Sequence, residues 1–251
     1  MTRAQHQASE LAERLGELAL EPVLLPVIEI AEPVSFGALD EALARLGSFQ
    51  WVVFTSVNAV EAARARGFSK IEGVRIAAIG QATARALEAA GMVADLVPAR
   101  SVAEALAREL VPYARQADGT ATRFLLVRAE EARDVLPDAL RAAGGEVTIA
   151  AAYRNVIPAG SVEAIGEMFS SAELMPDAIP FTSSSSARNL VALCKAAGVE
   201  LPRGVLRVSI GSITSETLRE LGYPADAEAP TASVRSLAET VALVLRQRNG
   251  I

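Results

Sequence analysis

Short, continuous runs of apolar residues alternate along this chain with segments in which apolar residues recur every three or four positions. The runs WVVFT (51–55), RFLLVR (123–128) and AIPFT (178–182) are typical of strands that are covered on both faces. The segments ATARALEAAG (82–91) and ITSETLRELG (213–222) have a helical period, and each closes on a Gly that suits the position after a helix. This alternation predicts an α/β protein with parallel sheets and right-handed crossovers.

The chain also repeats part of its own sequence. Residues 74–106 align with residues 206–237, and the tripeptide Phe-Thr-Ser at 54–56 recurs at 181–183. The spacing of about 130 residues is much longer than the repeat of a solenoid. We therefore expect two similar α/β domains. The predicted strands cover residues 23–30, 51–55, 74–79, 94–97, 123–128, 147–153, 178–182, 206–210 and 225–229.

The number of strands suggests where the two domains begin and end. Each repeat supplies three strands, whereas open doubly wound sheets of this size usually have about five. The middle of the chain supplies two more, so residues 36–152 are predicted to form an inserted domain. The C-terminal repeat must then draw its other strands from the N-terminus, which predicts a discontinuous domain of residues 1–30 and 160–251. Two extended crossings, 31–35 and 153–159, would link the domains.

Composition and charge exclude several classes of function. Hydrophobic residues make up 51% of the 251, as in a folded globular protein. The formal net charge of −6 and the lack of a Lys/Arg block argue against binding to nucleic acid or to an anionic membrane. The most apolar segment, 18–34, is interrupted by glutamates and prolines, so no membrane span is predicted. The charged N-terminus has no apolar signal core, which predicts a cytoplasmic protein.

Rare residues and missing motifs argue against a bound metal or nucleotide. Cys194 is the single cysteine and His6 the single histidine, too few for the usual zinc sites. A Ser-His-Asp triad would rest on His6, which lacks a nucleophile-elbow context. The strings GxGxxG and GxxxxGK[ST] do not occur in the sequence. We therefore predict neither a metal site nor a nucleotide cofactor.

A series of blocks in order carries a resemblance to a known family. It includes PVIEI (26–30), WVVFTSVNAVEAA (51–63), IAAIGQATARALEAAG (76–91), IPFTSSSSARNL (179–190) and VSIGSITSETLRELGY (208–223). Over nearly its whole length the chain resembles the uroporphyrinogen-III synthases. The resemblance implies two flavodoxin-like parallel-sheet domains, joined by a two-stranded linker with a cleft between them.

The resemblance also implies a reaction and a substrate. The substrate would be hydroxymethylbilane, a linear tetrapyrrole with eight carboxylates, which is cyclised to uroporphyrinogen III with loss of water and inversion of ring D. No cofactor is implied. A monomer is expected, and a transient handover of substrate from hydroxymethylbilane synthase is left open. The alternative is a non-catalytic regulator with the same fold that binds a tetrapyrrole or another small anion.

Small hydroxyl residues and glycines follow the predicted strands at the points where helices begin. Ligands of open α/β sheets bind beyond the carboxyl ends of the strands, where free helix N–H groups can bind anions. Ser and Thr also cap helices without any ligand, so the two roles are both open at these positions. The resemblance places the hydroxyl residues at the cleft, which favours binding of substrate carboxylates. The residues are Ser56, Thr83, Ser183 and Thr214, together with Gly80 and Gly211.

Tyr153 is the candidate for a chemical role, because it ends a predicted strand in a Tyr-Arg block that the resemblance includes. Its phenol could donate a proton to the departing hydroxyl, or the ring could simply pack at the crossing. Arg3 and Arg128 each stand at a predicted strand end, and arginines pair well with carboxylates. For Arg128, pairing with Glu130 or Glu131 is an equal alternative.

The chain departs from the family pattern at its first strand. That strand should end at Thr2-Arg3 and lie in the middle of its sheet. Loss of a central strand would leave backbone groups unpaired. We therefore expect that translation of the natural gene begins upstream of Met1, or else that the N-terminal segment pairs irregularly.

Overall fold

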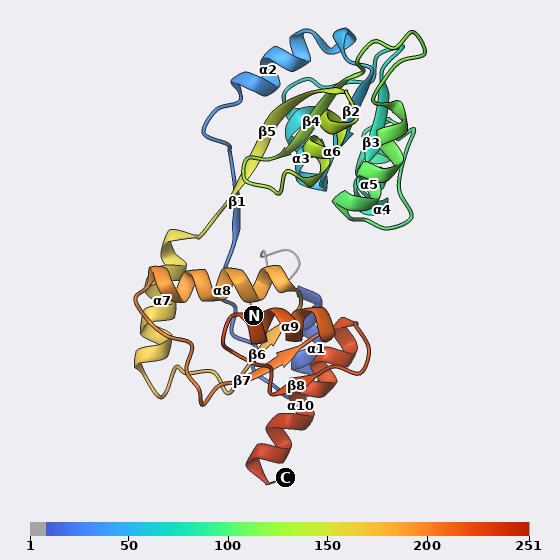
Figure 1. The fold of residues 1–251 in the computed structure, drawn as a ribbon. Coiled ribbons are helices and arrows are strands. Elements are labelled where there is room, and N and C mark those ends of the chain that lie inside the picture. The colour runs from blue at the N-terminus through green and yellow to red at the C-terminus, as the bar shows by residue number, and fades with distance from the viewer. Residues whose placement is uncertain (1–8, 251) are drawn as a thin grey trace. The chain divides into compact units, whose positions relative to one another are not determined.

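The structure, a computed structural model, describes residues 9–250 (Figure 1). Contacts divide the described chain into two units. Ile30–Asn155 form one, which we call the inserted unit. The described residues before Ile30 and from Val156 onwards form the other, which we call the discontinuous unit. The prediction of an α/β protein with parallel strands is confirmed. The strands within residues 51–153 pair in parallel with one another, and so do the strands within residues 178–228.

The inserted unit contains a five-stranded sheet with the order β1-β5-β4-β2-β3. The strands of this sheet are β1 (Glu29–Ala31), β2 (Trp51–Phe54), β3 (Arg75–Ala78), β4 (Arg123–Ala129) and β5 (Glu146–Val156), and β1 and β5 each extend one residue beyond the unit. Its helices are α2 (Gly37–Ala44), α3 (Val57–Ala65), α4 (Gln81–Ala89), α5 (Ala103–Leu110) and α6 (Val135–Ala142). The predicted strand at 94–97 is reduced to one parallel bridge, between Leu96 and Ala77.

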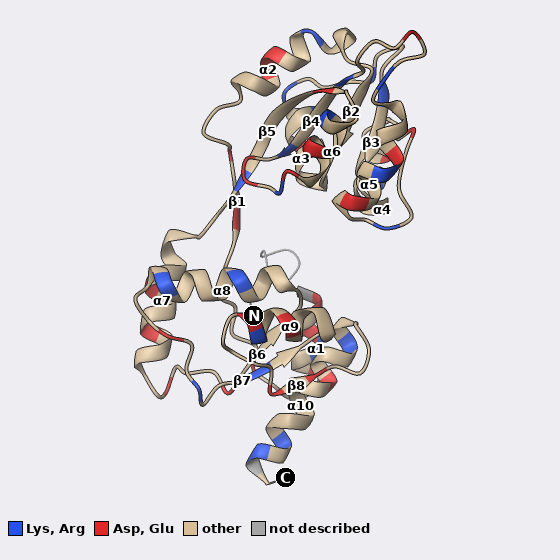
Figure 2. Cartoon of the chain, viewed as in Figure 1, with Lys and Arg blue, Asp and Glu red and all other residues tan. Residues whose placement is uncertain are grey.

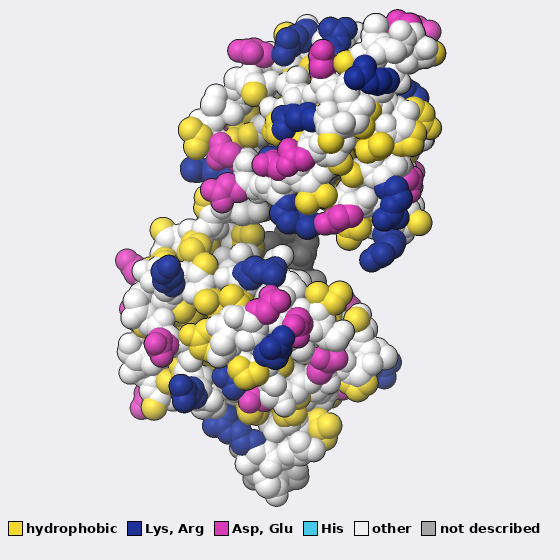
Figure 3. Space-filling view, viewed as in Figure 1, with side chains coloured by type: hydrophobic (Ala, Val, Ile, Leu, Met, Phe, Trp, Pro, Cys, Tyr) yellow, Lys and Arg dark blue, Asp and Glu magenta, His cyan; other side chains and the backbone are white. Residues whose placement is uncertain are grey.

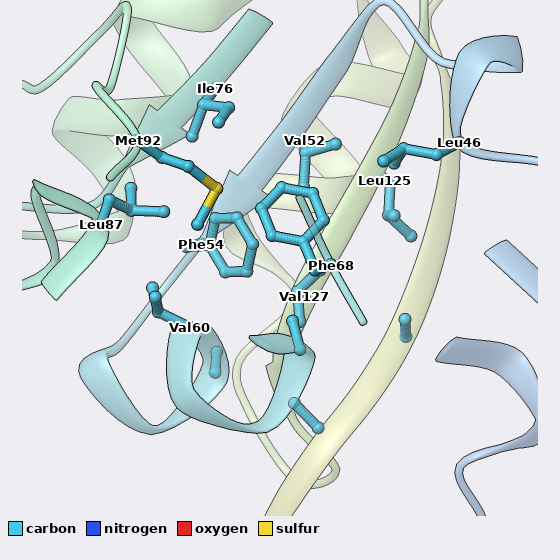
Figure 4. Packing of buried hydrophobic residues seen from close by; sticks show 14 of the residues in the cluster. Leu46, Val52, Phe54, Val60, Phe68, Ile76, Leu87, Met92, Leu125 and Val127 are labelled. Carbon is cyan, nitrogen blue, oxygen red and sulfur yellow. The ribbon is translucent and has the colours of Figure 1, made fainter. Parts of the chain in front are cut away.

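Side chains of the central strands point alternately to the two faces of this sheet, and each face has its own core. Val52 and Phe54 belong to a cluster that includes residues of α3 and α4, as Figure 4 shows around Phe54 and Phe68. The rings of Phe54 and Phe68 meet edge to face, with centroids 5.1 Å apart. Trp51 and Val53 join the other cluster, beneath α5 and α6. The continuous apolar runs therefore correspond to strands that are covered on both faces.

The discontinuous unit has a three-stranded parallel sheet with the order β6-β7-β8. Its strands are β6 (Ala178–Phe181), β7 (Leu206–Ser209) and β8 (Ala227–Glu228). Its helices are α1 (Ser9–Glu17), α7 (Ala159–Ser170), α8 (Ser184–Ala196), α9 (Ser212–Glu220) and α10 (Val234–Asn249). One core cluster includes residues of α7 and α8, and another includes residues of α1 and α10. Helices therefore cover both faces of this sheet as well.

The sequence repeat corresponds to a repeat in structure. Asp95 accepts a hydrogen bond from the backbone N–H of Ile76 in β3, at 2.7 Å. Asp226 accepts one from the N–H of Arg207 in β7, at 2.8 Å, and also pairs with the Arg207 guanidinium. In both units an aspartate 19 residues downstream thus binds the corresponding strand. The aligned segments therefore fold alike.

The predicted strand over 23–30 is wrong for most of its length. Residues 20–28 form no strand, and Glu29–Ala31 pair with β5 of the inserted unit. Pro22 and Pro26 lack the N–H groups that a strand ladder needs. Leu25 and Val27 are nevertheless buried in the core of the discontinuous unit, so their apolar character reflects packing. The strand expected at Thr2-Arg3 lies outside the described residues.

Charged side chains are mixed over the surface. Figure 2 shows acidic and basic residues on helices of both units, and in Figure 3 the two signs are interspersed on the visible face. Among the described helices, none is both long enough and apolar enough to cross a membrane.

Candidate functional site

The carboxyl ends of the parallel strands gather most of the predicted site residues within each unit. In the inserted unit, Ser56 and Gly80 follow β2 and β3, while Arg128 and Tyr153 lie near the ends of β4 and β5. Adjacent parallel strands end at the same edge of a sheet, so these residues share one edge. In the discontinuous unit, Ser183 and Gly211 follow β6 and β7 in the same way.

The two serines both act as helix caps. The Ser56 hydroxyl accepts a hydrogen bond from the N–H of Ala59, at 3.1 Å, and opens α3. The Ser183 hydroxyl accepts one from the N–H of Ser186, also at 3.1 Å, and the Ser186 hydroxyl accepts the N–H of Ser183 in return. This reciprocal pair is a capping box at the start of α8. The capping role left open for these serines is therefore present in the structure.

The two glycines open helices without any side-chain cap. Gly80 precedes α4 and Gly211 precedes α9, both in extended backbone conformations. The first N–H groups of a helix have no partner within the helix and attract anions. A Cβ on Gly80 would lie 1.9 Å from Oγ of Ser101, so the close approach of the 101 segment requires glycine there. A Cβ on Gly211 would meet only Cβ of Ala232, at 3.7 Å.

Thr83 and Thr214 occupy matching places in the first turns of α4 and α9, and both are buried, with 3% and 4% of their surface exposed. A contact between their side chains and substrate stays a prediction. The residues that these helix openings expose are instead Gln81 on α4 and Ser212 on α9, and Ile213 is 80% exposed. Gln81 and Ser212 each directly follow a glycine of the predicted site but are not among the predicted site residues.

Arg128 is buried and bound to its own loop. Its guanidinium donates to the backbone carbonyl of Arg133 at 3.1 Å and to Oδ1 of Asp134 at 2.7 Å, rather than to Glu130 or Glu131. The alternative of pairing with Glu130 or Glu131 is therefore wrong, because the chain turns back at Arg133 and Asp134, whereas a contact of Arg128 with substrate stays a prediction. Its Nε is buried and has no hydrogen-bond partner in the part of the chain that the structure describes. Arg3 lies outside the described residues.

The loop that Arg128 holds is also tied to the start of α5. Arg133 Nη1 donates to Oε1 of Glu104 at 2.7 Å. Backbone N–H donation at Glu104 and the Arg133 guanidinium lower the pKa of the Glu104 carboxyl. The end of β4, the following loop and α5 are thereby joined at the carboxyl edge.

Tyr153 lies at an irregularity in β5. The register of β5 against β4 shifts between Arg128, which pairs with Ala151, and Ala129, which pairs with Tyr153. Such a bulge redirects the side chains that follow it and is frequent near active sites. The ring is half-buried against the core, and its hydroxyl makes no hydrogen bond within the described chain. Both of the readings considered for Tyr153, packing and chemistry, are compatible with this position.

A network of hydroxyl groups at the carboxyl edge of the discontinuous unit was not predicted. Ser209 at the end of β7 contacts the Ser215 hydroxyl at 2.6 Å, and Ser215 donates to a carboxylate oxygen of Glu228 on β8. Ser184 accepts from Thr217 at 2.8 Å, which connects α8 to α9. The signal was the density of Ser and Thr in 182–186 and 212–217, but pairing between these segments depends on the tertiary fold.

The described residues offer little for a metal ion. No group of three or more His, Cys, Asp or Glu residues within 9–250 has the geometry of a metal site. Cys194 is buried in α8, and burial raises the pKa of its thiol to about 11, so the thiolate that metals prefer is disfavoured. His6 lies outside the described residues.

Comparison with known proteins places the chain in a family. The family model described as "Uroporphyrinogen-III synthase HemD" matches residues 9–239. A uroporphyrinogen-III synthase from Synechococcus elongatus is 34% identical over 232 residues, covering 88% of this chain and 84% of the relative. One from Chlorobaculum parvum is 27% identical over 235 residues and 90% of each chain.

Solved structures show the same fold. A mutant uroporphyrinogen III synthase from Thermus thermophilus superposes with a TM-score of 0.65 at 20% identity, covering 97% of each chain. The uroporphyrinogen-III synthetase of Helicobacter pylori gives a TM-score of 0.57 at 20% identity, covering 90% of this chain and 93% of the other. Family model, sequence relatives and fold agree along most of the length, and the chain belongs to the uroporphyrinogen-III synthase family.

Proposed function

We propose that this protein is a uroporphyrinogen-III synthase that cyclises hydroxymethylbilane, with loss of water and inversion of ring D. Family membership supports the reaction class. One structural observation carries the assignment to specific residues: α4 and α9 begin at glycines, at matching places in two repeated units, and neither has a side-chain cap. Each opening presents backbone N–H groups suited to a carboxylate, and the proposed substrate has eight.

The helix openings would bind the substrate by its carboxylates and so fix its conformation. A linear tetrapyrrole has many conformations, and productive closure needs one of them. Holding reacting groups in place can contribute about 7–11 kcal/mol to lowering a barrier. The protein would therefore act mainly by orienting its substrate. Gln81 and Ser212 are the exposed side chains beside the proposed anion sites.

Tyr153 is the group we propose for proton transfer. Loss of the terminal hydroxyl as water requires a proton, and a phenol can supply it when it is held against the leaving group. The bulge before Tyr153 supports this role, as does the lack of a hydrogen-bond partner for its hydroxyl among residues 9–250. Arg128 is assigned a positioning role, because its contacts are to its own loop.

We further propose that the units act as two flavodoxin-like domains of one cofactor-independent enzyme, with 31–35 and 153–159 as the linkers. The order of four strands in the sheet, β3-β2-β4-β5, supports this. When these strands are renumbered 1 to 4 along the chain, the order reads 2-1-3-4, which matches the first four strands of the flavodoxin order 2-1-3-4-5. β1 holds the fifth place, although it comes first in the chain.

The test is to supply hydroxymethylbilane, generated enzymatically, and to separate isomers I and III of the product by chromatography. Spontaneous closure gives isomer I, so formation of isomer III above a no-protein control supports the proposal. Tyr153→Phe is expected to slow isomer III formation while the Tm stays close to that of the unmodified protein. A protein that binds the tetrapyrrole and yields only isomer I would instead be the non-catalytic regulator.

A further inference from the structure

Glu130 joins the two segments that flank β5 at the carboxyl edge of the inserted unit. Its backbone N–H donates to the carbonyl of Tyr153 at 2.8 Å, and its carboxylate Oε1 accepts a hydrogen bond from the N–H of Val34 at 3.1 Å. Glu130 directly follows β4, and Val34 comes shortly after β1. In the sheet, β5 lies between β1 and β4 (Figure 1). Glu130 therefore connects the segments on both sides of β5, at the position of Tyr153.

A second contact ties the segment after β1 to the residue that follows Tyr153. Nε of Arg154 donates to the backbone carbonyl of Glu32 at 3.0 Å. The segment 32–34 is thus held at one end by Arg154 and at the other end by Glu130. Phe36, shortly beyond it, packs against the same core cluster as the ring of Tyr153.

The backbone at Tyr153 needs such support, because the strand is irregular there. The register of β5 against β4 passes over Ala152, immediately before Tyr153. A bulge of this kind locally disrupts the ladder of hydrogen bonds. A phenol that donates a proton must lie within hydrogen-bond reach of the leaving group. A misplacement of about 1 Å in an active site can cost about 100-fold in rate.

The contacts of Glu130 distinguish it from an ordinary surface glutamate. It is not the partner of Arg128, whose guanidinium binds the loop at Arg133 and Asp134. Glu130 is half-buried, whereas Glu131, the next residue, is exposed. Within residues 9–250, the side chain of Glu131 makes no hydrogen bond or ion pair. Glu131 is therefore a matched control for the loss of one negative charge at this place.

We propose that Glu130 is a positioning residue for the reaction: it holds the segment 32–34 against the bulge of β5 and thereby fixes the orientation of the Tyr153 phenol. This role rests on the function proposed above and on the part that Tyr153 plays in it. Removal of the Glu130 carboxylate frees the N–H of Val34 but leaves the backbone contact between Glu130 and Tyr153 in place. The change therefore affects the chemical step more than the binding of substrate.

The test compares Glu130→Ala with Glu131→Ala in the isomer III assay. Glu130→Ala is expected to lower kcat about tenfold or more with little change in KM, and Glu131→Ala is expected to change neither. Glu130→Gln keeps an oxygen that can accept the N–H of Val34, so it should recover most of the kcat. In a Tyr153→Phe protein, Glu130→Ala is expected to cause no further loss, because the group that it positions is gone.

An unchanged kcat in Glu130→Ala would overturn the positioning role. An equal loss with and without the Tyr153 hydroxyl would overturn it too, since general damage to the fold does not require that group. Should Glu130→Ala not fold, Glu130→Asp takes its place, because its carboxylate is one methylene short of Val34. If the unmodified protein forms no isomer III, the proposed function fails and this role fails with it. Formation of isomer III with an unchanged kcat in Glu130→Ala overturns the positioning role alone.

Discussion

A methyl group added at Gly80 should be costly, whereas the same change at the repeated position, Gly211, should be tolerated. At Gly80 the new Cβ would lie 1.9 Å from Oγ, 2.5 Å from Cβ and 3.3 Å from Cα of Ser101. A side-chain rotation can remove only the first of these contacts, so the 101 backbone must move. At Gly211 the nearest atom is 3.7 Å away, an ordinary van der Waals contact.

The expected loss for Gly80→Ala is about 1–3 kcal/mol in the free energy of unfolding, the usual range for overpacking. Gly211→Ala should stay within about 0.5 kcal/mol of the unmodified protein. Both glycines have extended backbones that alanine can adopt, so the difference isolates the steric contact. Urea unfolding of both variants measures it, and Gly80→Ala with Ser101→Gly should recover most of the loss. Equal stability of the two single variants would refute the reasoning.

The matched pair also separates stability from binding. Gly211→Ala places a methyl group beside the first N–H groups of α9 without disturbing the fold. If this opening binds a substrate carboxylate, the KM for hydroxymethylbilane should rise while the Tm does not change. An unchanged KM would remove the α9 opening from the binding site.

Further outcomes are expected at three residues. Ser183→Ala should lower the free energy of unfolding by about 1 kcal/mol, since it removes the cap of α8, and urea titration checks this. Tyr153→Phe should lower kcat for isomer III with little change in Tm, and an unaltered kcat would remove the chemical role. Burial raises the pKa of Cys194 from 9.0 to about 11, so the thiol should resist alkylation at pH 8 until the chain unfolds. In the unfolded chain this thiol ionises at a lower pH than in the folded protein. The contribution of the buried thiol to stability is therefore present below pH 9 and is lost as the pH rises towards 11. Unfolding measured at several pH values, with Cys194→Ala as the control, would show this loss.

The sequence pattern was reliable where apolar runs are strands covered on both faces, and it failed where apolar residues pack without pairing. WVVFT and RFLLVR form β2 and β4 because helices cover both sides of their sheet. The run at 23–28 is equally apolar, but its prolines break the ladder while Leu25 and Val27 still fill a core. In the run at 23–28, hydrophobicity therefore predicted the burial of side chains correctly but the type of element incorrectly.

Some features of the candidate site could be predicted from the sequence and others could not. Glycines and serines at strand ends were predictable, because sharp strand-to-helix turns restrict which residues can stand there. The pairing of Arg128 was not predictable, because its contact with Asp134 in place of the nearer glutamates depends on how the loop folds back. The Ser209–Ser215–Glu228 connection joins three separate elements, and no local pattern specifies it.

The internal repeat supports the proposal that this acidic protein binds a polyanion through its helix openings. A chain with a net charge of −6 would repel an octa-acid if binding relied on side-chain charge alone. Helix openings supply partial positive charge from the backbone, which adds nothing to the net charge of the chain. Duplication of a strand-Gly-helix element provides two such openings at once, at Gly80 and Gly211. Because each contact is weak, the affinity should depend on several carboxylates binding together, so a substrate analogue that lacks carboxylates should lose affinity with each one removed.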